Sequence, residues 1–403
     1  MTRPQHRYAN LLIGLALAAG CSAGQAAPAK TARYDTLPGS GTVVVTSPEP
    51  IGWSDSSQAW RFEEMARFGG ADGTESELVE PSNIGIDEWG RVYVADRKPP
   101  SVKVFDSTGA LLRVIGREGS GPGEFRVAFI AVRNGTLLVH DPMQSRTSVF
   151  DTSGSYLRSW KSSCCYWSDV TIDRSMRIYV PTMTLPDSTG KHRGRAYTRY
   201  TVDGALIDTL WVPIRESTKT WNVSSKDGKM RMSTSVPFMP NSYDTFHPAG
   251  GFVYGWNGDY RLALSPTGTD TARLVTRPWT AEPIPDARRE AQTKETLKWV
   301  TEQYGEATAN AAIKLSDVPT TAPAFINIRV DEEDNIWVRR FAGSDSAQTS
   351  YDIFRPDGAW LGPVVVPVAV PEWGNQYFAK GLVYAVTEDD DGRPTIVKLR
   401  IVR

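Results

Sequence analysis

A short strand motif occurs six times in this chain: a β-branched or aliphatic residue, then an aromatic residue or leucine, then a small apolar residue. Successive motif centres lie 45, 41, 75, 83 and 47 positions apart. Three of these spacings match one four-stranded propeller blade of about 40–50 residues, and the other two match a blade plus an insertion. The repeat therefore predicts an all-β, six-bladed β-propeller. The six centres are Tyr93, Leu138, Tyr179, Tyr254, Trp337 and Tyr384.

Each copy of the motif lies inside a larger repeating unit. An alternating strand precedes the motif and ends in a turn that begins with Asp87, Asp173 or Asp331 in the clearest copies. An aspartate at this place accepts hydrogen bonds from the amides of the turn. A third strand, a second turn and a fourth strand follow the motif, so each unit supplies four antiparallel strands.

The last unit lacks its fourth strand, because the chain ends at residue 403 after a third strand. A strand-like segment at residues 62–68 is followed by a glycine-rich run that parallels the run after residue 116. We therefore expect this N-terminal strand to complete blade six. Closing the ring in this way protects sheet edges that would otherwise be open.

Residues 81–116 resemble the NHL repeat, a unit of six-bladed ring proteins. Asp87, Gly90, Asp96 and Gly109 stand in the order of that family. Residues 119–160 are the next most similar stretch, and the resemblance fades after Trp211. The resemblance implies the fold strongly and the function weakly, because the family includes protein-binding rings and a few enzymes.

The first 27 residues have the features of an export signal: a basic start followed by an apolar stretch too short to span a bilayer. Gly20-Cys21 resembles a lipoprotein cleavage site, which would leave Cys21 lipidated, and the alternative is ordinary cleavage near Ala26 or Ala27. Either route predicts export, to the periplasm or to the outer membrane through a lipid anchor. We assign residues 28–60 to a lead-in segment and residues 61–403 to the propeller.

Charge and cysteine content narrow the possible partners. With 45 basic and 46 acidic residues the formal net charge is −1, which gives no support to a nucleic-acid partner. The two cysteines outside the signal are the neighbours Cys164 and Cys165. In an oxidising compartment they can close a strained vicinal disulfide. A free buried pair and an intermolecular bridge are the alternatives.

Three long insertions, at residues 181–196, 212–244 and 278–324, all fall where connections leave the same face of a propeller. We call this face the insertion rim and the opposite face the short-turn rim. Loops on one face of a rigid ring are where binding sites are usually found. Apolar residues at near-helical spacing predict a helix at about 281–315, between blades four and five. We expect it to cap the ring mouth or to cover exposed blade edges.

Basic residues follow several second strands and so face the insertion rim, where an arginine cluster would suit a carboxylate, a phosphate or an acidic protein patch. Scattered solvated charges are the alternative. His140 lies at an equivalent position and is a further candidate ligand-binding residue. The basic set comprises Arg97, Lys98, Arg146, His192, Arg193, Arg195, Arg339 and Arg340, of which Arg97, Lys98, Arg146 and Arg340 are the candidate ligand contacts.

Oxygen-bearing side chains on the first strands should lie near the propeller axis. They are Asn83, Asp169, Asp244 and Asn375. Such a ring has the ligand type that calcium prefers, as in the propeller lactonases. Ordered waters in a propeller channel would explain the same residues.

From these features we predict an exported, monomeric scaffold, without a cofactor, that binds a protein, peptide or saccharide on the insertion rim. The alternative is a calcium-assisted hydrolase or lyase that uses the axial oxygens.

Overall fold

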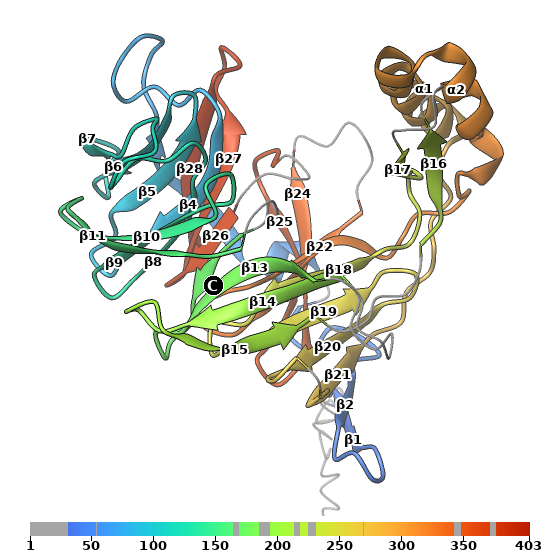
Figure 1. The fold of residues 1–403 in the computed structure, drawn as a ribbon. Coiled ribbons are helices and arrows are strands. Elements are labelled where there is room, and N and C mark those ends of the chain that lie inside the picture. Colours follow the sequence, from blue (N-terminus) through green and yellow to red (C-terminus); the bar gives the residue numbers. More distant parts are fainter. Residues whose placement is uncertain are drawn as a thin grey trace, which may run out of the picture.

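The computed structural model describes residues 31–53, 55–163, 169–184, 194–212, 218–224, 231–268, 270–341, 348–370 and 376–403. In the described residues, six blades, each with four antiparallel strands, are arranged around an axis, which makes the protein a six-bladed β-propeller (Figure 1). Blade 1 comprises β4 (Pro81–Ile86), β5 (Val92–Arg97), β6 (Pro100–Phe105) and β7 (Leu111–Ile115). Blade 2 comprises β8 (Phe129–Arg133), β9 (Thr136–Asp141), β10 (Arg146–Asp151) and β11 (Tyr156–Lys161).

The remaining blades have the same order of strands. Blade 3 comprises β12 (Thr171–Ile172), β13 (Ile178–Thr184), β14 (Gly194–Tyr200) and β15 (Leu206–Trp211). Blade 4 comprises β18 (Ser242–Phe246), β19 (Phe252–Trp256), β20 (Arg261–Ser265) and β21 (Arg273–Thr276). Blade 5 comprises β22 (Phe325–Val330), β23 (Ile336–Arg340), β24 (Thr349–Phe354) and β25 (Trp360–Val366). Blade 6 comprises β26 (Gln376–Ala379), β27 (Leu382–Glu388), β28 (Pro394–Val402) and, from the other end of the chain, β3 (Arg61–Phe68).

Ring closure by the N-terminal strand is confirmed. β3 pairs antiparallel with β28, from Ile396 opposite Phe68 to Val402 opposite Arg61. Phe68 is fully buried and packs its ring against Phe105 of blade 1 and Tyr384 of blade 6. The closing strand therefore joins two blades as well as completing one of them.

The turn aspartates are connected to the repeated strand motif. The carboxylate of Asp87 accepts hydrogen bonds from the N–H groups of Trp89 (3.0 Å) and Arg91 (2.9 Å), and from the side chains of Arg91 (2.5 Å) and Tyr93 (3.2 Å). The same arrangement joins Asp173 to Arg177 and Tyr179, and Asp331 to Asn335 and Trp337. The aromatic residue at the centre of the motif thus donates a hydrogen bond to the aspartate six residues before it.

The lead-in segment forms structure that the sequence did not indicate. A hairpin of β1 (Arg33–Thr36) and β2 (Val43–Thr46) adds to blade 4, where β2 pairs in parallel with β21 to give a six-stranded sheet. The short helix η1 (Ser56–Gln58) follows. Trp53 packs in the core between blades 5 and 6, and its indole donates a hydrogen bond to the carbonyl of Pro363 (2.6 Å).

Two insertions form one unit on the insertion rim. The hairpin of β16 (Thr220–Ser224) and β17 (Arg231–Ser235) packs with α1 (Asp286–Tyr304), α2 (Glu306–Ala312) and η2 (Leu315–Asp317) (Figure 1). Their shared core includes Trp221, Val300 and Ala309. We call these five elements the insertion module. The predicted helix is present, but its apolar face covers a second insertion rather than the ring mouth or bare blade edges. No helix in the described part of the chain is long and apolar enough to cross a membrane.

Candidate functional site: a cleft under the insertion module

A cavity of about 510 Å³ lies between the insertion module and the ring. The module contributes the segment from Ser235 to Met239 and one side of α1, and the ring contributes residues of blades 4 and 5 together with Ala369 and Val370. We call this cavity the rim cleft. It is within the size range of clefts that bind small molecules or the end of a polymer.

Arg288 contacts aromatic rings on both sides of the rim cleft. The guanidinium of Arg288, on α1, lies 5.3 Å from the ring centroid of Phe238 and 4.6 Å from that of Phe341. The two phenylalanine rings meet edge to face, with centroids 5.8 Å apart. Cation–π contacts of this kind help to hold the guanidinium in place. A helix, an inter-blade insertion and blade 5 are therefore linked at the cleft.

The charged side chains among the described lining residues of the rim cleft are two arginines. Arg288 and Arg339 are among its described lining residues, and no aspartate or glutamate is among them. Arg339 donates a hydrogen bond to the carbonyl of Val370 (2.6 Å), which orients it at the end of β23. The other polar side chains among the described lining residues carry amides or hydroxyls, as Asn241 and Gln292 do. Such groups can bind an oxygen-rich ligand.

A second cavity of about 390 Å³ adjoins the rim cleft and shares Pro323 and Phe341 with it. Arg340, predicted as a ligand contact, lines this second cavity together with Arg277. Arg277 has a structural role. Its guanidinium lies 4.1 Å from the ring centroid of Tyr260 and 4.4 Å from that of Trp360.

The charge of Arg277 is balanced by a buried carboxylate. Asp352 is fully buried and accepts hydrogen bonds from Arg277 (2.7 Å), Tyr260 (2.8 Å) and Trp360 (3.2 Å). Burial and the nearby Asp352 raise the pKa of Tyr260 well above its ordinary value, so it stays a hydrogen-bond donor. Arg340 lies further from this carboxylate, at 4.0 Å, and is half exposed. Of these two arginines, Arg340 is the one placed to meet a ligand.

The other predicted cationic contacts pair with groups in nearby connecting segments. Arg97 and Lys98 form ion pairs with Glu80 at 3.6 and 3.0 Å. Arg146 donates to the carbonyl of Ser120 (3.0 Å) and to that of Glu124. These residues belong to blades 1 and 2, whereas Arg340 belongs to blade 5, so the fold does not bring the set into one cluster.

His140 lies inside blade 2, not on its surface. The side chain is 1% exposed, and its Nδ1 lies 3.1 Å from the hydroxyl of Thr147 and 3.3 Å from that of Ser162. Burial lowers the pKa of His140 to about 4, so the ring is neutral at pH 7. Its neighbours and its burial give it a packing role in the sheet.

A narrow cavity of about 150 Å³ lies on the propeller axis and is lined by the first strands of the blades. Two of the predicted axial oxygen ligands meet there: the Asn83 amide lies 3.4 Å from the Asp169 carboxylate, and Asn83 also accepts a hydrogen bond from the N–H of Ile130 (2.7 Å). Asp244 is not among the described lining residues, and Asn375 lies outside the described part of the chain. Within that part, no three His, Cys, Asp or Glu side chains are grouped as metal ligands would be. The calcium site stays a prediction.

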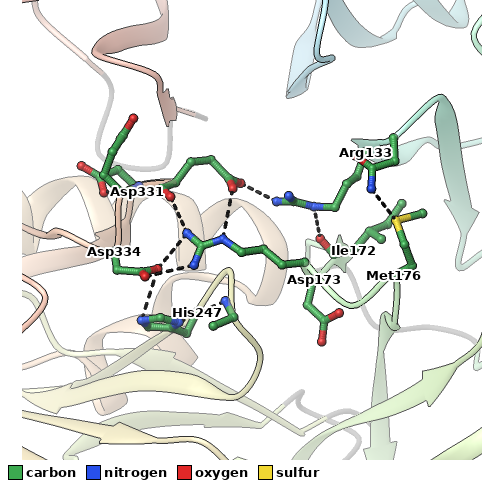
Figure 2. Close-up of polar contacts among 12 residues, drawn as sticks. Arg133, Ile172, Asp173, Met176, His247, Asp331 and Asp334 are labelled. Atoms are coloured by element: carbon green, nitrogen blue, oxygen red, sulfur yellow. Dashed lines mark hydrogen bonds and ion pairs between the residues drawn. The ribbon is translucent and has the colours of Figure 1, made fainter.

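The axial cavity is bridged at the short-turn rim by ion pairs (Figure 2). Arg133 of blade 2 lies 2.5 Å from Glu332, in the turn of blade 5. Blades 2 and 5 are opposite each other in a ring of six, so this pair crosses the axis. Arg174 of blade 3 joins Asp334 (2.9 Å), which also faces His247 of blade 4 (3.7 Å). The partners are up to 199 positions apart, which is why no local sequence pattern indicates them.

Several predicted residues lie outside the described part of the chain. They are Cys21, Cys164, Cys165, His192 and Arg193, in addition to Asn375. Arg195 lies on β14. The lipid anchor and the vicinal disulfide therefore stay predictions. Conversely, sequence reasoning missed Phe238, Arg288 and Phe341, because residues from two insertions and one blade meet only in the folded chain.

A comparison with protein families agrees with the fold. A family model described as a 6-bladed beta-propeller matches residues 73–182. The solved structures similar to this chain include a Bacteroides fragilis protein named as an exported protein, with 13% identity, a TM-score of 0.49, and coverage of 89% of this chain and 100% of the other. A DUF4221 family member from Bacteroides vulgatus has 11% identity, a TM-score of 0.47, and coverage of 86% and 98%.

Virginiamycin B lyase from Staphylococcus aureus is similar at 10% identity, with a TM-score of 0.42 and coverage of 85% of this chain and 100% of the lyase. Identities this low transfer no activity to this chain. No curated protein sequence matches this chain.

Proposed function

We propose that this protein is an exported propeller scaffold that binds a protein, peptide or saccharide ligand in the rim cleft, through an anionic group of that ligand. The observation that carries the proposal is the composition of the cleft: Arg288 and Arg339 line it together with aromatic rings and amides, without an acidic side chain among its described lining residues. A carboxylate or phosphate bound there would receive charge-assisted hydrogen bonds.

The chemistry of the lining favours binding over proton transfer. Guanidinium groups stay protonated at all physiological pH values, and amides and hydroxyls bind oxygen atoms without exchanging charge. The phenylalanine rings and Tyr243 offer flat apolar surface for a sugar ring or a side chain. Export rests on residues 1–27, with their basic start and short apolar stretch. We also propose that the repeats are of the NHL type, supported by the order of the residues in 81–116.

The proposal is tested by replacing Arg288 with Gln and measuring the fluorescence anisotropy of a labelled hexaglutamate peptide. A hydrogen bond to a charged group contributes about 1.5–3 kcal/mol, so we expect the Kd to rise by roughly 10- to 100-fold. The wild-type affinity should also fall with added salt. Competition by an oligogalacturonate, which carries the same charge on sugar rings, would show whether saccharides are accepted too.

Arg97→Gln is the matched control, because Arg97 faces the same rim but pairs with Glu80 in blade 1. This variant should bind hexaglutamate as the wild type does. A hexaglutamine peptide, of equal length and without charge, should bind much more weakly than hexaglutamate. Equal affinity of Arg288→Gln and wild type, with both proteins folded, would contradict the proposal.

A further inference from the structure

Four charged side chains are among the described lining residues of the axial cavity, and only two of them have a partner of opposite charge. Arg133 and Glu332 form the ion pair that crosses the axis (2.5 Å), and Glu332 also lies 3.9 Å from Arg174. Figure 2 shows Arg133 at this end of the cavity. The other two are Asp169 of blade 3 and Arg329 of blade 5, which form no ion pair with any described residue. The cavity therefore has one carboxylate and one guanidinium whose charges are not balanced.

These two groups lie at the same level of the cavity. Asp169 stands four positions before the turn aspartate of its blade, as Asn83 and Asn327 do in blades 1 and 5. Its carboxylate lies 3.4 Å from the amide of Asn83. The side chain of Arg329 turns back along its strand, because its Nη1 donates hydrogen bonds to the side chain of Asn327 (2.8 Å) and to the carbonyl of Ile328 (3.1 Å). Both charges thus face the cavity at the level of the two asparagines.

Both groups also keep atoms that a ligand can reach. Asp169 uses only Oδ1 for a hydrogen bond, and Arg329 uses only Nη1. The Oδ2 atom of Asp169 and the Nε and Nη2 atoms of Arg329 have no partner among the described residues, and none of these atoms is fully buried. A charged group in the wall of a cavity needs water or a group of opposite charge. Here the wall offers one charge of each sign.

The volume of the cavity limits the size of a ligand. The cavity measures about 150 Å³, and an engineered cavity of that volume holds benzene. Alanine has as many non-hydrogen atoms as benzene. Apart from the charges, the wall combines apolar side chains such as Ile130 and Val170 with the hydroxyls of Thr171 and Thr245. This volume and these side chains suit a small amino acid with a short side chain.

We infer that the axial cavity is a second binding site, which takes a small amino acid in its zwitterionic form. Arg329 binds the carboxylate through the N–H groups that it does not use within the fold, and Asp169 binds the ammonium group. A divalent cation is disfavoured, because it would meet one carboxylate and would be repelled by the guanidinium at the same level. A simple anion or a simple amine would leave one of the two charges without a partner.

The experiment titrates the wild type with L-alanine and with two molecules of matched shape by isothermal titration calorimetry. Lactate has a hydroxyl in place of the ammonium group, and alaninamide has an amide in place of the carboxylate. Each lacks one charge-assisted contact, which contributes about 10- to 100-fold in affinity, so we expect alanine to bind more tightly than either by about that factor. L-Phenylalanine, which carries the same charges on a larger body, should not bind.

Two substitutions separate the two contacts. Asp169→Asn removes the partner of the ammonium group, so this variant should bind alanine and lactate about equally. Arg329→Gln removes the partner of the carboxylate, so this variant should bind alanine and alaninamide about equally. Circular dichroism establishes that each variant is folded. The two ratios of affinity in the wild type need no variant, so they test the inference even where a substitution prevents folding.

Arg288→Gln separates this site from the proposed function, because Arg288 lines the rim cleft, which shares no described lining residue with the axial cavity. It should weaken hexaglutamate binding and leave alanine binding as in the wild type. The inference fails if the wild type does not bind alanine, if lactate or alaninamide binds as tightly, or if both preferences survive in Asp169→Asn and Arg329→Gln. Alanine binding that depends on Arg288 would also overturn it, as would a wild type that binds calcium chloride through Asp169 and does not bind alanine.

Discussion

Buried polar side chains in this protein differ in how completely they are paired. Asp352 is fully buried and receives three hydrogen bonds, from an arginine, a tyrosine and a tryptophan. His140 is nearly as buried, yet only its Nδ1 has partners, and its Nε2 is without one among the described residues. A neutral imidazole tolerates this, whereas a charged one would not, since burial of an unpaired charge is far more costly. The contrast makes His140 a sensitive site for acid.

We predict that His140 contributes to the acid sensitivity of folding. Its pKa is about 4 in the folded chain and about 6.5 when unfolded, so the unfolded chain binds the proton first as the pH falls. Stability is therefore fully present above pH 7 and is lost between pH 6.5 and 4, by about 2 kcal/mol at pH 5. Urea unfolding of wild type and His140→Phe from pH 7 to pH 5 measures this. The variant should lose less stability, and parallel pH profiles would refute the prediction.

The repeating element of the propeller is a strand, a turn that starts with aspartate, and a strand with an aromatic centre. Its carboxylate satisfies turn amides and, at the same time, the side chains four and six residues later. The second turn of a blade also uses aspartate, as at Asp106, but there the partners are only the local amides and Thr108. The first turn is therefore anchored to the core, and the second is a surface turn.

This difference predicts unequal effects of two similar substitutions. Asp87→Ala leaves the guanidinium of Arg91 and the buried hydroxyl of Tyr93 without their partner, and we expect a loss of about 3 kcal/mol in the free energy of unfolding. Asp106→Ala removes an exposed turn acceptor and should cost clearly less. Urea denaturation of both variants measures the two losses in the free energy of unfolding. Equal losses would show that the hydrogen bond from Tyr93 to Asp87 adds no stability.

At the scale of the whole molecule, two long-range contacts define the ring. β3 and β28 close it at its circumference, across more than 300 positions of sequence, and the Arg133–Glu332 pair crosses its axis at the short-turn rim. The insertion module adds a third feature, because it rises from one part of the insertion rim and makes the two faces of the disc unlike (Figure 1). The rim cleft exists only because the module and the ring meet.

Loss of packing at the closure should destabilise the entire ring. Phe68→Ala removes a fully buried ring that contacts Phe105 and Tyr384, and we expect a loss of about 3–5 kcal/mol. Met65→Ala lies on the same strand but is half exposed, so it should change stability by about 0.5 kcal/mol or less. Chemical unfolding followed by tryptophan fluorescence measures both. A small effect of Phe68→Ala would mean that the ring holds without this contact.

The sequence by itself determined the architecture, because blade formation is local. The period of the strand motif, Asp87 and its equivalents, and the unpaired last strand each depend on neighbours within about 50 residues, and each could be recognised without coordinates. The predicted helix at about 281–315 could also be recognised from the sequence, since its apolar residues recur at near-helical spacing.

Only the tertiary structure decided which side chains meet. Arg97 and Arg146 face the predicted rim, but nearby connecting segments supply their partners, which a position at the end of a strand does not reveal. Arg288 and Phe238 come from different insertions and meet Phe341 of blade 5 at the cleft. The buried hydroxyl of Tyr384, which has no hydrogen-bond partner among the described residues, is likewise not evident from the sequence. Spacing along the chain sets strands and turns, whereas a binding site depends on contacts between residues far apart in sequence, and these are determined only when the ring closes and the insertions pack.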